Sequence, residues 1–159
     1  MRNNKGFSLV ELIIVIAIMA ILVGVMAPQL IKYIEKSNVS ADTQVCDSIH
    51  SAILTSMMDP EVVTSTDSAT QQALANLTTA RSITAIVGQS DRFSKSVMDI
   101  MGVSSSADIT LKSHGTAGLL VASNIQVRTD GNRCSVWIIG SDATGSKGTG
   151  SATSVISVY

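Results

Sequence analysis

Residues 5–28 read KGFSLVELIIVIAIMAILVGVMAP, and the apolar part of this stretch decides how the chain is organised. No charged residue occurs between Leu12 and Ala27. Together with the residues from Phe7 onward, the run approaches the roughly 20 residues that a helix needs to cross the hydrocarbon core of a membrane. A helix is required there because lipid cannot satisfy exposed backbone groups. The sequence therefore predicts a transmembrane helix near the N-terminus.

Basic residues predict the direction of this span. Arg2 and Lys5 precede the apolar run, and basic residues beside a span are retained on the cytoplasmic side. We therefore expect Met1 in the cytoplasm and the part of the chain beyond the span outside the membrane.

The sequence changes character after Pro28, where apolar residues recur at helical spacing. Most of them fall on one half of a helical wheel; they are Leu30, Ile31, Ile34, Ala41, Val45, Ile49, Ala52, Ile53 and Met57. Asp59-Pro60 ends this pattern, because the residue before a proline is driven out of the helical region. One helix from Phe7 to Met58 would be roughly 78 Å long. Part of it must be buried in lipid or in neighbouring subunits.

The chain from Asp59 onward predicts a small domain of mixed structure. Residues 68–87 are typical of a second helix that Gly88 stops, and residues 91–101 of a third that ends at Gly102. Beyond these helices apolar and polar residues alternate, which predicts strands.

One hairpin is predicted in this strand region. Asp130-Gly131 is a strong signal for a two-residue turn, and the register that it implies places Val127 opposite Cys134. Residues 141–150 are rich in Gly, Ser and Thr and predict a loop, and residues 154–159 predict a last strand.

The predicted fold class is α+β. An antiparallel sheet with one apolar face needs a cover, and the amphipathic half of the long helix can supply it. We therefore expect a long N-terminal helix packed on a small antiparallel sheet, with extra short helices in the connecting region.

Composition and charge exclude several classes of function. The formal net charge is -1 and charged residues make up 14% of the chain, against roughly 25% in average proteins. Such a chain has no basic field that would hold nucleic acid. Two cysteines and two histidines are too few for a zinc ribbon. No nucleophile–base pair, phosphate loop or pair of carboxylates can be assembled, so we expect no enzyme and neither a metal nor a cofactor.

The start of the apolar run carries a specific pattern, KGFSLVEL over residues 5–12. A short basic leader comes first, a glycine precedes an aromatic residue, and a glutamate follows. A charge-free span then continues to Pro28. This pattern resembles the prepilin signal of the type IV pilin superfamily, and the resemblance implies a pilin-like fold.

In that superfamily a membrane aspartyl peptidase cuts the precursor after the glycine, and the new N-terminus is methylated. The resemblance implies cleavage between Gly6 and Phe7 and N-methylation of Phe7. Residues 1–6 would be a leader peptide and residues 7–28 a transmembrane and filament-core helix. Residues 29–159 would be an extracellular head that includes the amphipathic half of the helix. Glycine suits the cleavage site, because a protease needs an accessible backbone.

Glu11 lies one helical turn beyond the amine that this cleavage would create on Phe7. The resemblance implies that Glu11 pairs with the terminal amine of a neighbouring subunit and sets the register of assembly. A carboxylate in apolar surroundings needs such a partner once the subunit leaves the lipid. The local alternative is a helix-terminal charge that interacts favourably with the helix dipole.

Pro28 has no N–H group and crowds the carbonyl of Gly24, so the turn between them is expected to be weak. One interpretation is a kink where the helix leaves the membrane. The other, which the resemblance implies, is a segment that unwinds when the helix packs into a filament. The two are compatible.

The resemblance implies a structural subunit of a type IV pilus, made as a cell-membrane precursor and polymerised into an extracellular filament on the cell surface. Its implied partners are copies of itself in a helical homopolymer, the prepilin peptidase, the membrane platform that assembles the pilus, and membrane lipid before assembly. One alternative is a pseudopilin of a type II secretion or DNA-uptake system. Remoter ones are a secreted binding protein with an ordinary signal peptide and a plain single-span membrane protein.

Cys46 and Cys134 leave two alternatives open. Cys46 lies at the edge of the apolar helical face, and Cys134 alternates in step with Val136 and Ile138. A bridge would tie the helix to the sheet, and oxidation is possible if that part of the chain is exported. Without a bridge they would be two buried free thiols.

Overall fold

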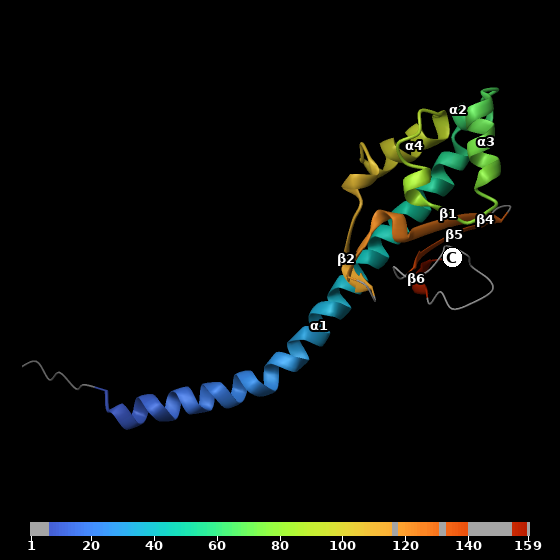
Figure 1. The fold of residues 1–159 in the computed structure, drawn as a ribbon. Coiled ribbons are helices and arrows are strands. Elements are labelled where there is room, and N and C mark those ends of the chain that lie inside the picture. Colours follow the sequence, from blue (N-terminus) through green and yellow to red (C-terminus); the bar gives the residue numbers. More distant parts are fainter. Residues whose placement is uncertain (1–6, 116–117, 131–132, 140–153, 159) are drawn as a thin grey trace, which may run out of the picture. The chain divides into compact units, whose positions relative to one another are not determined.

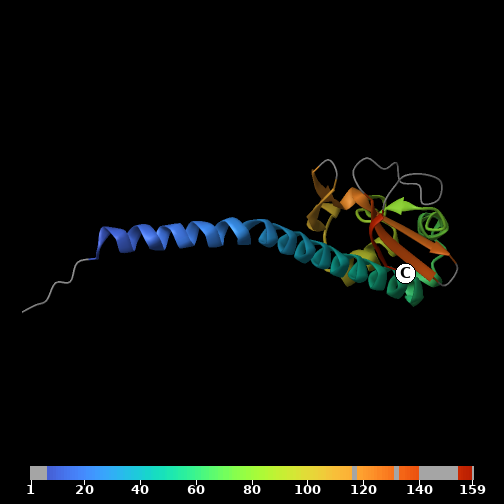
Figure 2. The same ribbon diagram turned by 90° about the horizontal axis from the view of Figure 1, so that it is seen from below.

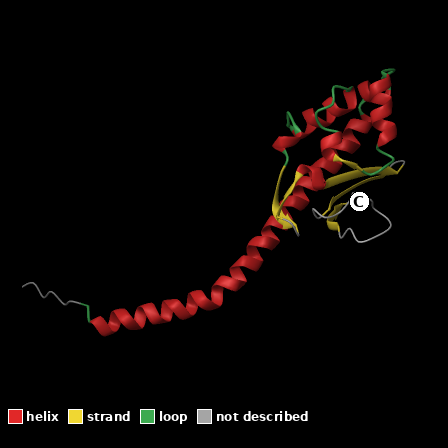
Figure 3. Ribbon diagram, viewed as in Figure 1, coloured by secondary structure: helices red, strands yellow, loops and turns green. Residues whose placement is uncertain are grey.

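The computed structural model describes residues 7–115, 118–130, 133–139 and 154–158. Its fold is α+β, as the sequence predicts: one long helix precedes several short helices and small antiparallel sheets (Figures 1 and 3). The chain divides into two compact units, residues 1–37 and residues 38–159. The predicted loop at 141–150 lies outside the described residues.

The long helix, α1 (Leu9–Met58), continues through Pro28 without interruption. It begins at Leu9, slightly later than the apolar pattern suggests. Its first part is rich in Ile and Val, which are weak helix formers because their side chains are stiff. An apolar environment favours the helix there, since unpaired backbone groups are costly outside water.

α1 ends at Met58, as Asp59-Pro60 predicts, and a further short helix follows at once. This helix, α2 (Pro60–Val63), is capped by Asp59, whose Oδ1 accepts a hydrogen bond from the Glu61 amide at 2.9 Å. Pro60 fits the first helical position, where the missing N–H group needs no partner. The sequence indicated the end of α1 but not this extra turn.

The second helix is much shorter than the predicted range of residues 68–87, and that prediction was wrong in its length. α3 (Ser68–Asn76) is followed by a turn in which the Thr78 hydroxyl donates to the Ala75 carbonyl at 2.9 Å. Such side-chain bonds offer the backbone an alternative to further helix. Beyond the turn, β1 (Arg81–Ser82) pairs with the sheet, so strand pairing replaces the helical pattern.

The third predicted helix is confirmed. α4 (Arg92–Met101) begins after Asp91, whose carboxylate accepts hydrogen bonds from the Ser94 amide at 3.0 Å and from the Ser94 hydroxyl at 2.7 Å. It ends at Gly102, which adopts the left-handed conformation with a φ of 67°. Glycine tolerates this geometry at a helix end without strain.

Two antiparallel sheets complete the second unit. The larger has the strand order β1-β4-β5-β6, and the smaller pairs β2 with β3. The remaining strands are β2 (Thr110–Gly115), β3 (Gly118–Val121), β4 (Ile125–Asp130), β5 (Arg133–Ile139) and β6 (Ser154–Val158). Short 3-10 helices occupy Ile83–Ala85 (η1), Ser106–Asp108 (η2) and Ala122–Asn124 (η3).

The β4–β5 hairpin does not have the predicted register. Val127 pairs with Val136 instead of Cys134, which is a shift of two residues, and Asp130 pairs with Arg133. The shift keeps every side chain on its predicted face, because side chains in a strand alternate with a period of two. The observed register also places Asp130 opposite Arg133, and cross-strand pairs of opposite charge are favourable.

A hydrophobic core joins the second half of α1 to the larger sheet, as predicted. The contributing residues are Cys46, Ile49, Ala52 and Ile53 from α1, and Ile125, Val127, Val136 and Ile138 from β4 and β5. Figures 1 and 2 show this part of α1 beside the two strands. Leu30, Ile31 and Ile34, which share the predicted apolar face, are exposed instead. The cover of the sheet is therefore the C-terminal part of the helix.

The same region of α1 buries a charged residue. Asp42 is 1% exposed, and its carboxylate accepts hydrogen bonds from the amides of Lys112 and Ser113, both at 2.8 Å, and from the Ser113 hydroxyl. A buried carboxylate is tolerated when its oxygens are hydrogen-bonded in this way. Asp42 thereby fixes β2 to α1.

We predict that Asp42→Ala lowers the free energy of unfolding by about 3 kcal/mol, because the amides of Lys112 and Ser113 lose their acceptor. Asp47→Ala, at an exposed position of the same helix, should change it by less than about 0.5 kcal/mol. Chemical unfolding of the full chain in detergent micelles, followed by the fluorescence of buried Trp137, measures both. Equal effects of the two substitutions would contradict the role of Asp42.

Candidate functional site

The N-terminal part of α1 is a continuous apolar surface. Every residue from Phe7 to Ile34 is exposed. Within the described part of the chain, α1 is the helix that is long and apolar enough to cross a membrane, by length and composition. An apolar surface of this extent marks a site of contact with lipid or with other proteins.

Glu11 caps the beginning of this helix. Its Oε2 atom accepts a hydrogen bond from the Ser8 amide at 2.9 Å, and the Leu12 amide donates to the Ser8 carbonyl at 3.3 Å. The carboxylate satisfies a backbone donor that has no partner within the helix. It also lies at the positive end of the helix dipole. This geometry corresponds to the local alternative for Glu11, a charge at the helix terminus that interacts favourably with the helix dipole.

The residues of the expected cleavage site lie just before the cap. Phe7 directly precedes Ser8 and is 88% exposed, whereas Gly6 lies outside the described residues. Cleavage between Gly6 and Phe7 and methylation of Phe7 therefore stay predictions.

Pro28 lies inside α1, and the helix continues on both sides of it. The carbonyl of Gly24 would normally accept a bond from residue 28, and proline has no N–H group to donate. A side chain at Gly24 would meet no atom within 4 Å, so this glycine is not required by close packing within the chain. Unwinding at this turn during assembly stays a prediction.

Cys46 and Cys134 belong to the same hydrophobic core and are both free cysteines in the structure. Burial, with a smaller contribution from the carboxylates of Asp42 and Asp47, raises the pKa of the Cys46 thiol to about 12. Burial raises the pKa of the Cys134 thiol to about 11. A bridge and two buried free thiols stay the two alternatives that the sequence left open.

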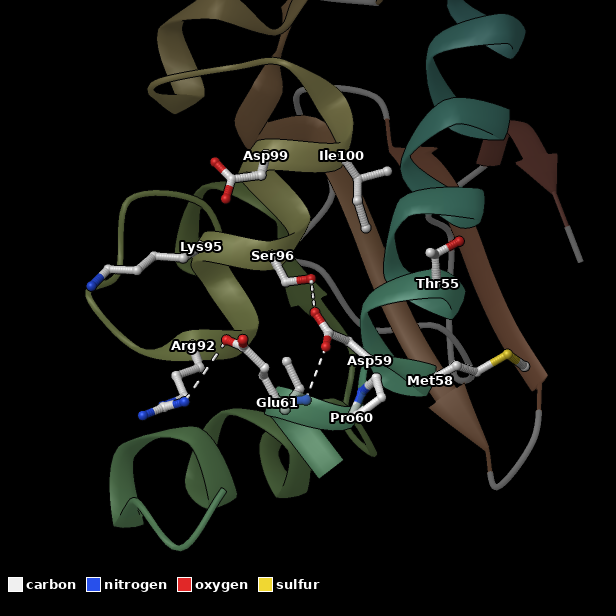
Figure 4. A pocket seen from close by; sticks show the side chains of 11 residues that line it. Thr55, Met58, Asp59, Pro60, Glu61, Arg92, Lys95, Ser96, Asp99 and Ile100 are labelled. Atoms are coloured by element: carbon white, nitrogen blue, oxygen red, sulfur yellow. Dashed lines mark hydrogen bonds and ion pairs between the residues drawn. The ribbon is translucent and has the colours of Figure 1, made fainter. Parts of the chain in front are cut away.

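A groove of about 920 Å³ lies where α1, α2 and α4 meet. Figure 4 shows Asp59 pointing toward Ser96, whose hydroxyl donates to it at 3.1 Å, and Glu61 facing Arg92 at 3.9 Å. The side chains of Asp59, Glu61 and Arg92 thus contact neighbours across this junction of helices. No group of three or more metal-binding side chains occurs among the described residues.

Sequence reasoning missed Asp42 as a structural residue. Its signal was its spacing: Asp42, Cys46, Ile49 and Ile53 follow one another at four, three and four residues, which places them on one helix face. An acidic residue in line with core positions indicates a buried hydrogen-bonded carboxylate.

Comparison with known proteins gives two similarities. Residues 1–27 match the family described as "Prokaryotic N-terminal methylation motif". The chain is also 47% identical over 53 residues to the type IV wide pilus major component PilA4 of Thermus thermophilus. The N-terminal segment of this chain is therefore pilin-like. No solved structure matches it.

The similarity of this chain to its relative is partial. It covers 33% of the chain and 38% of the length of the Thermus protein. The long apolar helix and the small antiparallel sheets are consistent with a pilin-like α+β fold.

We predict that both thiols of the folded chain resist alkylation at pH 8, because burial keeps them protonated. Unfolding in denaturant without reductant should expose two reactive thiols, whereas a bridge would yield none until reductant is added. Mass spectrometry after maleimide treatment counts the labels. Rapid labelling of the folded chain would contradict the buried positions of Cys46 and Cys134.

The same pKa shifts predict alkaline sensitivity. The folded state retains thiol protons that the unfolded state releases above the ordinary pKa of 9.0. Folding stability should therefore be intact below about pH 9 and fall as the pH rises toward 11 to 12. Unfolding midpoints measured from pH 8 to pH 11 would show this decline.

Proposed function

We propose that this chain is a structural subunit of a type IV pilus, polymerised through its N-terminal helix into a filament on the cell surface. The observation that carries the proposal is the coincidence of two features in one segment. Residues 1–27 match the methylation motif, and the described residues of that segment form a wholly exposed apolar helix. A processing signal on an uncovered apolar helix fits a segment that lies first in lipid and later against other copies. The pilus role of the Thermus protein favours a pilus subunit over a pseudopilin.

The proposal divides the chain by role. Residues 1–6 form the leader, residues 7–28 the membrane and filament-core helix, and residues 29–159 the extracellular head. The prepilin peptidase cuts between Gly6 and Phe7, the new amine of Phe7 is methylated, and the membrane platform adds the subunit to the filament. The chain itself carries out no catalytic step.

Before assembly the precursor spans the cell membrane once. Arg2 and Lys5 hold the N-terminus on the cytoplasmic side, and the head lies outside. Transfer from lipid into a filament exchanges one apolar environment for another, so the hydrophobic effect alone does not drive it. Packing and polar contacts between subunits must then supply the specificity.

Glu11 supplies such a polar contact in this proposal by pairing with the Phe7 amine of a neighbouring copy. In the free chain its Oε2 is bonded to the Ser8 amide at 2.9 Å. An ionised carboxylate accepts several hydrogen bonds, so Oε1 can accept from an ammonium group while the cap remains. The two roles of Glu11 are therefore compatible.

Pro28 is proposed to mark the turn that unwinds on assembly. The helix lacks one backbone hydrogen bond at this position whether or not it is in a filament. Opening it there loses fewer bonds than opening it elsewhere in the span. The weak turn therefore concentrates any change of helix path between Gly24 and Pro28.

We predict that the mature chain isolated from the cell surface begins at N-methylated Phe7. Mass spectrometry of its N-terminal peptide should show the loss of residues 1–6 and the added methyl group. Gly6→Leu should block the cut, because a bulky side chain replaces the small residue before the junction. A mature N-terminus near Ala27 would instead establish an ordinary signal peptide.

We predict that Glu11→Gln sharply reduces the yield of filaments while leaving membrane insertion and cleavage intact. The Phe7 amine of a neighbour would enter an apolar core without its partner, at a cost of about 3 to 5 kcal/mol for breaking a buried pair. The yield is measured by shearing filaments from cells and quantifying the subunit against the total cleaved chain.

Two control substitutions separate the pair from local effects. Glu11→Asp keeps the charge and should retain more filaments than Glu11→Gln. Glu61→Gln removes an exposed carboxylate of the second unit, which forms a long ion pair with Arg92 at 3.9 Å, and should leave the yield unchanged. Normal filaments from Glu11→Gln, with cleavage verified, would reduce Glu11 to a helix cap.

A further inference from the structure

A hollow in the second unit has the side chains of a small polar binding site. It has a volume of about 290 Å³ and is bounded by α3, β1, η1 and the start of α4. α3 and α4 are in contact and lie side by side in Figure 1. The polar side chains lining it are Gln72, Asn76, Arg81, Gln89, Ser90, Asp91 and Ser94.

Arg81 is the one basic residue among the described residues that line the hollow. Its backbone is held by pairing with Val127 of β4, and the residue is half-buried. Among the described residues its guanidinium makes neither an ion pair nor a hydrogen bond. A planar guanidinium presents five donors that match a carboxylate in two parallel hydrogen bonds. The group is thus available to an anion.

The acidic residue of the same lining is already engaged. Asp91 is 7% exposed, and its two oxygens accept from the amide and hydroxyl of Ser94 at 3.0 and 2.7 Å. These bonds cap α4, and among the described residues no ion pair joins Asp91 to Arg81. The carboxylate of a ligand can therefore pair with the Arg81 guanidinium.

Three carboxamides surround this arginine in the hollow. Gln72, Asn76 and Gln89 are exposed, and their side chains make no hydrogen bond within the described part of the chain. Each carboxamide offers donors and an acceptor. A hydroxyl group has the same double character, so the set suits a ligand with several hydroxyls.

We propose that this hollow binds a hexuronate, a sugar ring that bears a carboxylate. The carboxylate pairs with Arg81, and the ring hydroxyls bond to the carboxamides of Gln72, Asn76 and Gln89. The volume of about 290 Å³ lies just below the roughly 300 to 1,000 Å³ of ligand pockets for drug-sized molecules, which suits one ring. An inorganic anion would use Arg81 alone. The site is independent of the proposed filament role.

The test is calorimetric titration of the full chain in detergent micelles with D-glucuronate, D-glucose and inorganic phosphate. Glucuronate should bind saturably. Glucose and phosphate should bind at least tenfold more weakly, because glucose lacks the carboxylate that pairs with Arg81 and phosphate lacks the ring hydroxyls that bond to the carboxamides. Arg81→Gln should weaken glucuronate binding at least tenfold, and Gln89→Ala several-fold. Lys95→Gln removes an exposed positive charge of α4 that lines the other groove, and should leave the affinity unchanged.

Three results would overturn the site. Equal losses in Arg81→Gln and Lys95→Gln would reduce it to general electrostatic attraction. Phosphate that binds as tightly as glucuronate would make it a plain anion site, and equal binding of glucose would remove the role of Arg81. If circular dichroism shows that Arg81→Gln does not fold, Arg81→Lys and Gln89→Ala decide: unchanged glucuronate affinity in both rejects the proposal.

Discussion

The packing of one face of α1 against β4 and β5 is the contact on which the rest of the structure depends. It buries Cys46, Ile49 and Ile53 completely, and it gives the sheet the cover that an apolar sheet face needs. The same helix is exposed throughout its first part. α1 therefore has two roles. Its C-terminal part belongs to the hydrophobic core of the second unit, and its N-terminal part requires an apolar surrounding.

Aspartates hold the small elements around this core. Asp59, Asp67 and Asp91 cap the three helices that follow α1, and Asp108 accepts from the amides of Ser104 and Ser105. The Thr70 hydroxyl and nearby amides keep the pKa of Asp67 below its ordinary value. The chain has few charged residues, and several of its aspartates accept hydrogen bonds from backbone amides at the starts of helices. Asp42 accepts such bonds from the amides of β2.

The sequence predicted the features that depend on long runs or on residue-specific chemistry. The charge-free run indicated α1, Asp59-Pro60 its end, and Gly102 the end of α4. The α3 prediction failed because the helical pattern after Asn76 coincides with a segment that pairs with β4 instead, and strand pairing is a tertiary effect. The hairpin register failed by two residues because alternation fixes the face of a side chain but not its partner. The cap made by Glu11 and the burial of Asp42 depend on neighbours that spacing alone only suggests.

The buried contact of Asp42 with β2 has a consequence for the order of folding. Its partners, Lys112 and Ser113, follow far along the chain, and the core contacts of α1 come from strands that are later still. Contacts between distant segments form slowly, because a long loop must first close. If the residues beyond the span are exported in chain order while the N-terminus stays in the cytoplasm, the apolar face of α1 remains without its sheet until the C-terminal strands emerge. The interval between export of Asp42 and export of β5 is then the period in which the unfinished protein is most exposed to aggregation and proteolysis.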